Sequence, residues 1–287
     1  MKKLLLIDSS ALIYRFFHAL PPLTTPEHDQ IQAIYGLTSI ILKIFSSPDR
    51  PECVAAAFDR PEKTFRKEKF QDYKSQRPPA PNELITQIRR MPEVFEIFGI
   101  KTFELPGYEA DDILGTLSEN FSSYSDVQTI ILSGDLDVLQ LVKGDRVVGE
   151  IIKTGVSDTV TYNEARVEER YGLKPNQLPD YKALIGDNSD NIPGVKGIGP
   201  KSALPLVKEF RTLENIYDNL AIITPAVAKK LADKKEIALL YRELTTIKKD
   251  VSIVMPKLED LIIKAFDKDK LSAYFSKLGF TSLLKRI

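Results

Sequence analysis

The sequence predicts an α/β fold, with a mostly parallel central sheet flanked by helices and a helical lobe after it. Short apolar runs typical of buried strands alternate with helical segments in the first part of the chain, which is the pattern of a doubly wound sheet. From about residue 164 the pattern becomes helical, and 287 residues exceed what one hydrophobic core usually organises. We therefore expect an α/β domain over residues 1–165 and a helical domain over residues 166–287.

The individual elements follow from periodicity and from the residues that interrupt it. The predicted strands are short apolar or β-branched runs, and they cover residues 2–8, 53–59, 99–105, 127–135, 146–152 and 158–163. The predicted helices have apolar residues at helical spacing, and they cover residues 31–46, 82–98 and 107–121, a segment from 136 to about 142, and most of the chain after 163. Asn82 is expected to cap its helix, and Pro92 is expected to kink or split it.

Nine carboxylates lie in five short, well-separated stretches, most of which are otherwise apolar. They are Asp8, Asp59, Glu109, Asp111, Asp112, Asp135, Asp137, Asp187 and Asp190. Asp8, Asp59 and Asp135 each follow an apolar run closely, so they should converge on one edge of the sheet, where α/β folds place their sites. So many like charges repel strongly unless divalent cations neutralise them, and the pattern therefore predicts a multi-metal site.

The chemistry of these acids favours hard divalent cations. Mg²⁺ takes oxygen ligands and keeps several waters, so nine acids can serve two ions through direct and water-mediated contacts. His18 and His28 are the only histidines and Cys53 is the only cysteine, which argues against zinc. The three acids at 109–112 have a second interpretation, because acidic residues also stabilise the N-terminus of a helix.

A glycine-rich stretch, residues 191–203 (NIPGVKGIGPKSA), leads into a predicted helix. Gly194, Gly197 and Gly199 would let backbone N–H groups approach a phosphate closely, with Lys196 and Lys201 beside them. Helical neighbours on both sides predict a helix–hairpin–helix over about residues 178–210, a motif that contacts duplex backbone without reading sequence. A simple turn between helices is the alternative.

Basic and aromatic residues alternate in the stretch after Asp59. Tyr73, Lys74 and Arg77 belong to it, and this mixture suits phosphate contact and base stacking. A solvated charged helix is the alternative. Residues 60–77 hold seven cations against three acids, although the whole chain has 40 Lys plus Arg and 40 Asp plus Glu. The zero net charge therefore reflects segregation of charge.

The composition indicates the cellular compartment in which the protein is expected. The chain is 43% hydrophobic and 28% charged, as in ordinary globular proteins. Cys53 lies in an apolar run and is expected to be a small buried core residue; without a disulfide framework, we expect a cytoplasmic protein. Only four apolar residues precede Asp8, too few for a signal peptide, and no run is long enough to span a membrane.

Taken together, these stretches resemble the 5′ nuclease family, which includes flap endonucleases and the 5′–3′ exonuclease module of bacterial DNA polymerase I. The resemblance covers essentially the whole chain, and it rests on FDRPEKTFR, YKSQRP, GYEADD, SGDLDVLQLV and LIGDNSDNIPGVKGIGPKSA. It is strongest to the polymerase I module. It implies a PIN-like or resolvase-like sheet domain, a helical arch over about residues 62–98, and a C-terminal lobe that contains the helix–hairpin–helix.

The resemblance also implies roles for single residues. Asp8, Asp59, Glu109 and Asp111 would hold a first metal with Asp112 beside it, and Asp135, Asp137 and Asp190 would hold a second, with Asp187 as an additional acid. Arg66, Lys74 and Arg77 would act on the scissile phosphate and the 5′ strand. DNA contacts would come from Tyr14, Tyr73 and the glycine stretch, with K⁺ assisting at the hairpin.

The activity that the resemblance implies is a structure-specific 5′ nuclease that uses two Mg²⁺ or Mn²⁺ ions. It would act as a monomer on branched or nicked DNA with a 5′ end or flap, in replication and repair, and a DNA polymerase domain is a possible partner. Two alternatives stay open: a ribonuclease on a related acidic-site fold, and a non-catalytic module that binds branched DNA.

Overall fold

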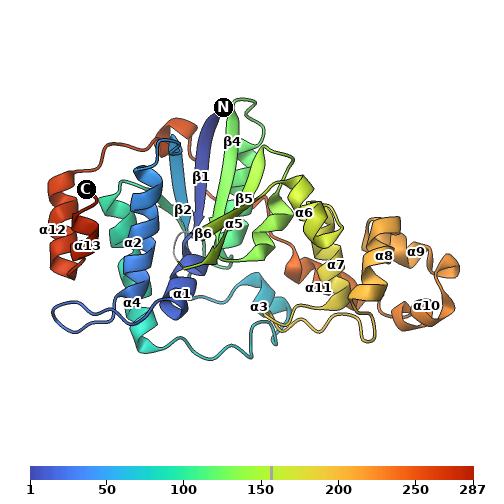
Figure 1. Ribbon diagram of the computed structural model, residues 1–287. Helices are drawn as coiled ribbons and strands as arrows, with labels where there is room; N and C mark the ends of the chain where they lie inside the picture. The colour runs from blue at the N-terminus through green and yellow to red at the C-terminus, as the bar shows by residue number, and fades with distance from the viewer. Residues whose placement is uncertain (156–157) are drawn as a thin grey trace.

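The computed structural model describes residues 1–155 and 158–287 (Figure 1). Its centre is a six-stranded sheet of order β3-β2-β1-β4-β5-β6. The strands are β1 (Lys2–Asp8), β2 (Cys53–Ala57), β3 (Lys101–Phe103), β4 (Val127–Ser133), β5 (Val147–Thr154) and β6 (Asp158–Tyr162). All neighbours pair in parallel except β5 and β6, which are antiparallel. The predicted mostly parallel sheet is confirmed.

The first strand β1 lies at the point where the strand order reverses, between β2 and β4. Successive side chains of a strand point to opposite faces, and both faces of β1 are buried. Leu4 and Leu6 belong to the hydrophobic cluster on one face, and Leu5 and Ile7 to the cluster on the other. Burial on both faces explains why the strand is a continuous apolar run that ends abruptly at Asp8.

Helices cover both faces of the sheet (Figure 1). The bounds in this part are α1 (Ser9–Ala19), α2 (Gln32–Phe45), α3 (Phe65–Lys69), α4 (Asn82–Ile97), α5 (Ala110–Phe121) and the 3₁₀ helix η1 (Leu136–Leu141). Residues of α1, α2 and α4 pack on one face, and residues of α5 and η1 pack on the other. The N-terminus of α2 is held inside the core by Gln87, whose Oε1 accepts hydrogen bonds from the N–H groups of Ala33 and Ile34 at 2.8 and 3.4 Å.

Three local predictions need correction in whole or in part. Pro92 does not split α4, which continues through it, and the expected cap at Asn82 was wrong, because the residue at the N-cap is Pro81 and Asn82 is already helical. The segment after β4 forms η1, a 3₁₀ helix, where an ordinary helix was expected. In η1 the side chain of Asp135 accepts a hydrogen bond from the Asp137 N–H, which fixes a tight turn directly after the strand.

The chain after β6 is helical, as predicted, and its helices pack in two separate regions of the molecule. Its elements are α6 (Glu164–Tyr171), η2 (Pro175–Gln177), α7 (Leu178–Ile185), α8 (Pro200–Phe210), α9 (Leu213–Asp218), η3 (Leu220–Ile222), α10 (Pro225–Leu231), α11 (Lys235–Thr245), η4 (Leu258–Leu261), α12 (Lys268–Leu278) and α13 (Thr281–Leu284). The helices α7 to α11 form the lobe beside the sheet, whereas α12 and α13 return to lie against α2 (Figure 1). Cys53 is buried, as expected. Within residues 1–155 and 158–287, no helix is long and apolar enough to cross a membrane.

Candidate functional site

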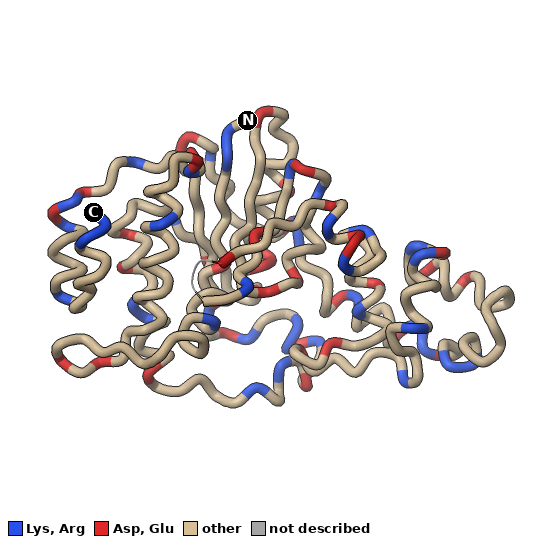
Figure 2. The backbone as a smooth tube through the Cα atoms, viewed as in Figure 1, with Lys and Arg blue, Asp and Glu red and all other residues tan. Residues whose placement is uncertain are grey.

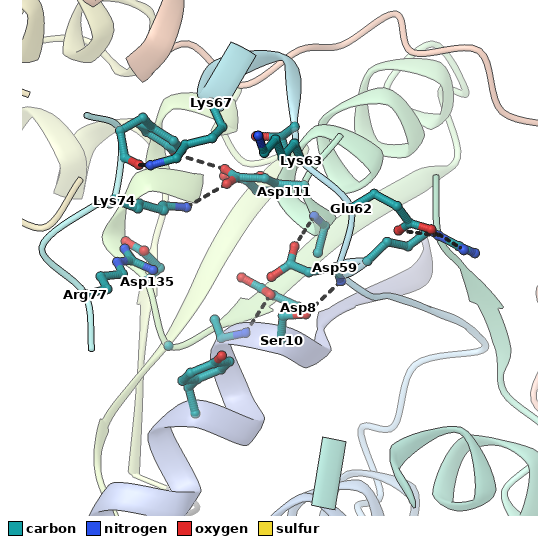
Figure 3. A pocket seen from close by; sticks show the side chains of 18 residues that line it. Asp8, Ser10, Asp59, Glu62, Lys63, Lys67, Lys74, Arg77, Asp111 and Asp135 are labelled. Carbon is teal, nitrogen blue, oxygen red and sulfur yellow. Dashed lines mark hydrogen bonds and ion pairs between the residues drawn. The ribbon is translucent and has the colours of Figure 1, made fainter. Parts of the chain in front are cut away.

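The carboxyl edge of the sheet opens into a cavity of about 560 Å³ (Figure 3). Five of the nine predicted acids line it: Asp8, Asp59, Glu109, Asp111 and Asp135. Four predicted DNA-contact residues line it as well: Tyr14, Tyr73, Lys74 and Arg77. The structure therefore brings side chains from four separate acidic stretches and the basic stretch into one place.

Asp8 and Asp59 are fixed by the ends of neighbouring strands. The Asp8 carboxylate accepts hydrogen bonds from the Ala11 N–H at 3.0 Å and from the Ser133 hydroxyl at 2.7 Å, so it caps α1 and reaches across to β4. Asp59 accepts a hydrogen bond from the Ala110 N–H at 2.7 Å, at the start of α5. Burial raises the pKa of both carboxyls, and that of Asp8 reaches about 7. Neither forms an ion pair with a described residue.

The raised pKa of Asp8 predicts a pH-dependent stability. Folded Asp8 keeps its proton up to about pH 7, whereas unfolded Asp8 releases it near its usual pKa of 3.8, so stability falls as the pH rises between these values. In the metal-free protein, Asp8→Asn should therefore raise the melting temperature more at pH 8 than at pH 5. Thermal unfolding at both pH values checks this, and an equal shift at both would contradict it.

Asp111 and Asp112 are adjacent in sequence but have different environments. Asp111 lines the cavity, and its Oδ1 is buried without a hydrogen-bond partner; burial raises its pKa well above the usual range. Asp112 is 0% exposed and does not line the cavity. Both of its oxygens accept hydrogen bonds from the Arg66 guanidinium, at 2.6 and 2.7 Å. The structure therefore places Asp111 in the site and Asp112 behind it.

Arg66 is buried beneath the cavity and does not line it. Besides Asp112, it donates hydrogen bonds to the carbonyl oxygens of Leu244 and Thr246, both at 2.9 Å. It thus ties α3 and the start of α5 to the end of α11. In this arrangement Arg66 supports the acidic residues from behind, including Glu109 at 3.3 Å, and does not line the cavity.

Glu109 accepts hydrogen bonds from two side chains of the basic stretch. Its carboxylate accepts hydrogen bonds from Lys74 Nζ at 2.8 Å and from the Tyr73 hydroxyl at 3.0 Å. Burial acts to raise the pKa of Glu109, but the neighbouring Lys74 and Arg66 outweigh it and hold the pKa below its usual value. The Tyr73 hydroxyl also lies 3.0 Å from Asp190 Oδ2, so this tyrosine joins two of the acidic stretches.

The remaining acids form a second group beside the cavity. Lys182 Nζ donates to Asp137 Oδ1 and to Asp187 Oδ2, the latter at 2.6 Å. Asp190 Oδ1 accepts a hydrogen bond from Arg77 Nη2 at 2.8 Å. Asp137, Asp187 and Asp190 are therefore each paired with a cation of the chain itself, and none of them lines the cavity.

The donor set fits a hard divalent cation, although it is not preassembled. Among the described residues, no group of three or more His, Cys, Asp or Glu side chains is arranged so that it could already hold a metal ion. Several of the acids instead form ion pairs with Lys or Arg. The buried, unpartnered Oδ1 of Asp111 and the cluster of carboxylates with raised pKa values are what such a cation would satisfy.

The basic stretch forms an arch that is only partly helical. The helix α3 covers Phe65–Lys69, and residues 70–81 run below the carboxyl edge of the sheet before α4 enters the core (Figure 1). Figure 2 shows Lys and Arg along this segment, which runs below the acids near the centre of the view. Lys74 has a left-handed backbone, with φ of 52°, and its N–H donates to the Asp190 carbonyl oxygen at 2.9 Å. The arch is thereby fixed to the segment that follows α7.

The glycine stretch forms a tight hairpin between α7 and α8. Gly194 has φ of 69°, and a Cβ there would lie 2.3 Å from the Gly186 nitrogen. Lys196 and Lys201 are exposed, and neither forms an ion pair with another described residue. Lys230 Nζ donates to the Gly197 carbonyl oxygen at 3.0 Å, which ties α10 to the hairpin.

The hairpin geometry predicts different tolerances at two of its glycines. Gly194→Ala combines a left-handed φ with overlap against backbone, so we expect it to cost about 2–4 kcal/mol of stability. Gly199→Ala is the matched control, because Gly199 has φ of −109° and a Cβ there meets nothing within 4 Å. Urea unfolding of both variants measures the difference. Equal losses would contradict the hairpin geometry described here.

Several residues of the site were not predicted. Ser10 and Ser133 hold the acids in place, since the Ser10 hydroxyl accepts from the Asp59 N–H at 2.8 Å and the Ser133 hydroxyl donates to Asp8. Lys63 and Lys67 line the cavity. Lys182 pairs two acids that are 50 residues apart in sequence. Ser10 carried a usable signal, because it lies two residues after the acid that ends a predicted strand, and Lys63 and Lys67 belong to the basic stretch 60–77.

The fold and the acidic cavity define a nuclease-type α/β protein with a helical lobe. The chain belongs to the 5′–3′ exonuclease family: residues 3–172 match the family's N-terminal resolvase-like domain, and residues 173–269 match its C-terminal SAM fold. The resemblance stated from the sequence is confirmed. The family models divide the chain at 172/173, near the predicted boundary at 165/166, which stays a prediction.

Two curated relatives illustrate the family. The chain is 42% identical to a DNA polymerase I of Caldicellulosiruptor bescii, covering 99% of this chain and 33% of that protein. It is 38% identical to a 5′–3′ exonuclease of Aquifex aeolicus, covering 100% of this chain and 96% of that protein. The chain thus spans about a third of the length of the DNA polymerase I relatives it matches.

Two solved structures share the fold. The T5 D15 protein co-crystallised with metal ions aligns with a TM-score of 0.68 at 22% identity, covering 85% of this chain and 89% of that one. The catalytic core of Rad2 in complex with a DNA substrate aligns with a TM-score of 0.64 at 19% identity, covering 99% and 90%. At these identities the likeness shows the fold alone.

Proposed function

We propose that the chain is a structure-specific, sequence-independent 5′ nuclease that cleaves DNA flaps and 5′ ends, leaving a 5′-phosphate and a 3′-hydroxyl. One observation carries the proposal: acids from separate strands and helices converge on one cavity directly behind a cationic arch. A cavity of this charge cannot attract a phosphodiester by itself, whereas an arch with Lys74 and Arg77 can. Family membership supports the same reaction.

The reaction requires cations that the acids can hold. Asp8, Asp59, Glu109 and Asp111 would hold a first divalent cation, and Asp135, Asp137, Asp187 and Asp190 a second, with Mg²⁺ or Mn²⁺ in both positions. Bound there, the cations would supply a nucleophilic water at neutral pH and stabilise the leaving oxygen. We assign Asp112 a supporting role through Arg66, because both of its oxygens are already engaged.

The side chains around the acids bind and orient the DNA. Lys74 and Arg77 are held against Glu109 and Asp190, and both line the cavity, so a phosphate entering it would compete for their charged groups. Tyr14 lies at the mouth, 44% exposed, where a base at the 5′ end can stack on its ring. Duplex DNA would be held by the hairpin backbone with Lys196 and Lys201, and K⁺ at the hairpin would assist.

The wider context of this activity is also a proposal. Replication and repair create 5′ flaps and nicks, and the DNA polymerase I relatives suggest a polymerase as a domain or partner of this nuclease. We propose that it acts in the cytoplasm, because its one free cysteine suits a reducing compartment. We also propose that it acts as a monomer.

A cleavage assay tests the proposal. The protein is incubated with 5′-labelled flapped and nicked DNA duplexes in Mg²⁺ or in EDTA, beside the same substrates with RNA flaps. We expect metal-dependent cleavage of DNA that weakens steeply as salt is raised, since phosphate contacts dominate the affinity. Cleavage in EDTA would overturn the metal assignment, exclusive cleavage of RNA would favour the ribonuclease, and tight flap binding in Mg²⁺ without turnover would favour a binding module.

A further inference from the structure

Four of the five acids that line the cavity differ from the acids beside it in one respect, and the fifth, Glu109, is paired with Lys74. Asp8, Asp59, Asp111 and Asp135 line the cavity, and none of them forms an ion pair with any residue in the described ranges 1–155 and 158–287. Asp137 and Asp187, in contrast, share the ammonium group of Lys182. A cation that enters the cavity therefore finds unpaired carboxylates first, while the other acids are already neutralised.

Lys182 is built into this position by two elements. It lies on α7, and Asp187 follows the end of that helix, where the Ser189 N–H and hydroxyl also donate to Asp187 Oδ1 at 2.9 and 2.6 Å. Asp137 lies in η1, after β4. Burial tends to lower the pKa of Lys182, but the two carboxylates outweigh it and keep the ammonium charged. A lysine is an ammonium at neutral pH in any case, and here it forms an ion pair with each of the two carboxylates.

We propose that Lys182 is a resident cation that competes with the second divalent cation for Asp137 and Asp187. This inference rests on the proposed function, which requires two cations. Its consequence is that the two sites differ in affinity: the first cation finds three unpaired carboxylates, Asp8, Asp59 and Asp111, and meets a charged group of the chain only at Glu109. The second must displace the Lys182 ammonium from both Asp137 and Asp187. Without any cation there, Lys182 prevents repulsion between the two carboxylates.

The Lys182 ammonium can be displaced from Asp137 and Asp187. The Lys182 side chain is 25% exposed, and its head is carried on a flexible four-carbon stem that can withdraw toward solvent. A divalent cation has twice the charge of an ammonium and bonds directly to carboxylate oxygens, so it wins once its concentration is sufficient. An arginine at the same position would keep the charge, which offers a conservative comparison.

The same ion pair joins the two family domains. Asp137 lies in the part that matches the N-terminal domain, and Lys182 in the part that matches the C-terminal domain. Exchange of Lys182 for a divalent cation would therefore replace one link between these parts with another. A divalent cation shared by Asp137 and Asp187 would keep the hairpin lobe next to the cavity after Lys182 has left.

Calorimetric titration of the metal-free, DNA-free protein with Mn²⁺ tests the inference without relying on activity. For the wild type we expect one tighter and one weaker site, and for Lys182→Met we expect the weaker site to tighten by about tenfold or more, since a competing charge at this distance is removed. Lys182→Arg should keep the weak second site. Lys143→Met is the matched control, because Lys143 pairs with Glu119 on the surface, and it should bind Mn²⁺ like the wild type.

Melting temperatures give a second readout. In EDTA, Lys182→Met should melt below the wild type because Asp137 and Asp187 then repel each other, and Mn²⁺ should raise its melting temperature more than that of the wild type. Lys182→Gln is a second neutral variant should the methionine impair folding. An unchanged or weaker second site in both neutral variants would overturn the inference alone. A wild type that binds no Mn²⁺ at all would overturn the proposed function, and this inference with it.

Discussion

Asp111→Asn should abolish cleavage while leaving the protein folded. The amide has the shape of the carboxyl, and burial already raises the pKa of Asp111, so loss of the negative charge costs the metal-free fold little and can stabilise it. Cleavage should fall by more than the roughly 10–100-fold that follows from losing an outer partner of a metal ligand. Single-turnover cleavage of a flapped duplex in Mg²⁺ measures the loss, and thermal unfolding in EDTA measures stability.

The adjacent residue provides the control for this experiment. Asp112→Asn changes an acid of the same kind in the same helical turn, but it leaves the Arg66 guanidinium buried without its full charge partner. We expect this variant to lose stability in EDTA, and to lose cleavage mainly because it is less folded. Full activity in Asp111→Asn, or equal stability changes in the two variants, would contradict the division of roles between these neighbouring acids.

The second large effect concerns Arg66. Its side chain is 2% exposed and that of Asp112 is 0% exposed, so Arg66→Met leaves a buried carboxylate without its cation and removes the Arg66 donor from two carbonyl oxygens. Removal of one partner from a buried ion pair typically costs about 3–5 kcal/mol. We expect a loss of this size in urea unfolding of the metal-free protein. Arg90→Met, which breaks the surface pair with Asp29, should change stability by less than about 1 kcal/mol.

A double-mutant cycle separates the ion pair from its surroundings. The variant with both Arg66→Met and Asp112→Asn should be destabilised by much less than the sum of the two single changes, because neither charge is then left unpaired. Additive losses would show that Arg66 acts through its carbonyl partners Leu244 and Thr246 and not through Asp112.

The sheet and the acidic site could be predicted because both leave a local pattern in the sequence. The strand before Asp8 contains the apolar run 4–7 and the strand before Asp135 contains the apolar run 130–132, and parallel strands place the residues that follow such runs on one edge. The glycines at 194 and 197 were informative for a similar reason, since both adopt a positive φ that other residues rarely take.

What could not be predicted depends on pairing between distant segments. Nothing near Lys182 indicates that its partner is Asp137, 45 residues earlier, and Arg66 differs from its basic neighbours only in being buried against Asp112. The uninterrupted helix at Pro92 has a similar cause, because α4 buries Met91, Val94 and Phe95 in the core and packing outweighs the one lost hydrogen bond. The 3₁₀ form of η1 follows from the turn at Asp135, and periodicity over six residues cannot distinguish it.

The connection from Arg66 to residues 244 and 246 has a consequence for synthesis on the ribosome. The acids at 8, 59, 109, 111 and 135 emerge early, but the start of α5 is tied down only when the carbonyl oxygens of Leu244 and Thr246 and the Lys248 N–H, which donates to Asp112 at 2.8 Å, have been made. At about 5–20 residues per second, the growing chain would expose an incomplete acid cluster for several seconds. A nascent chain that has not reached residue 248 therefore lacks the support that holds these acids in place, and we expect cleavage of DNA only after residues 244–248 have been made.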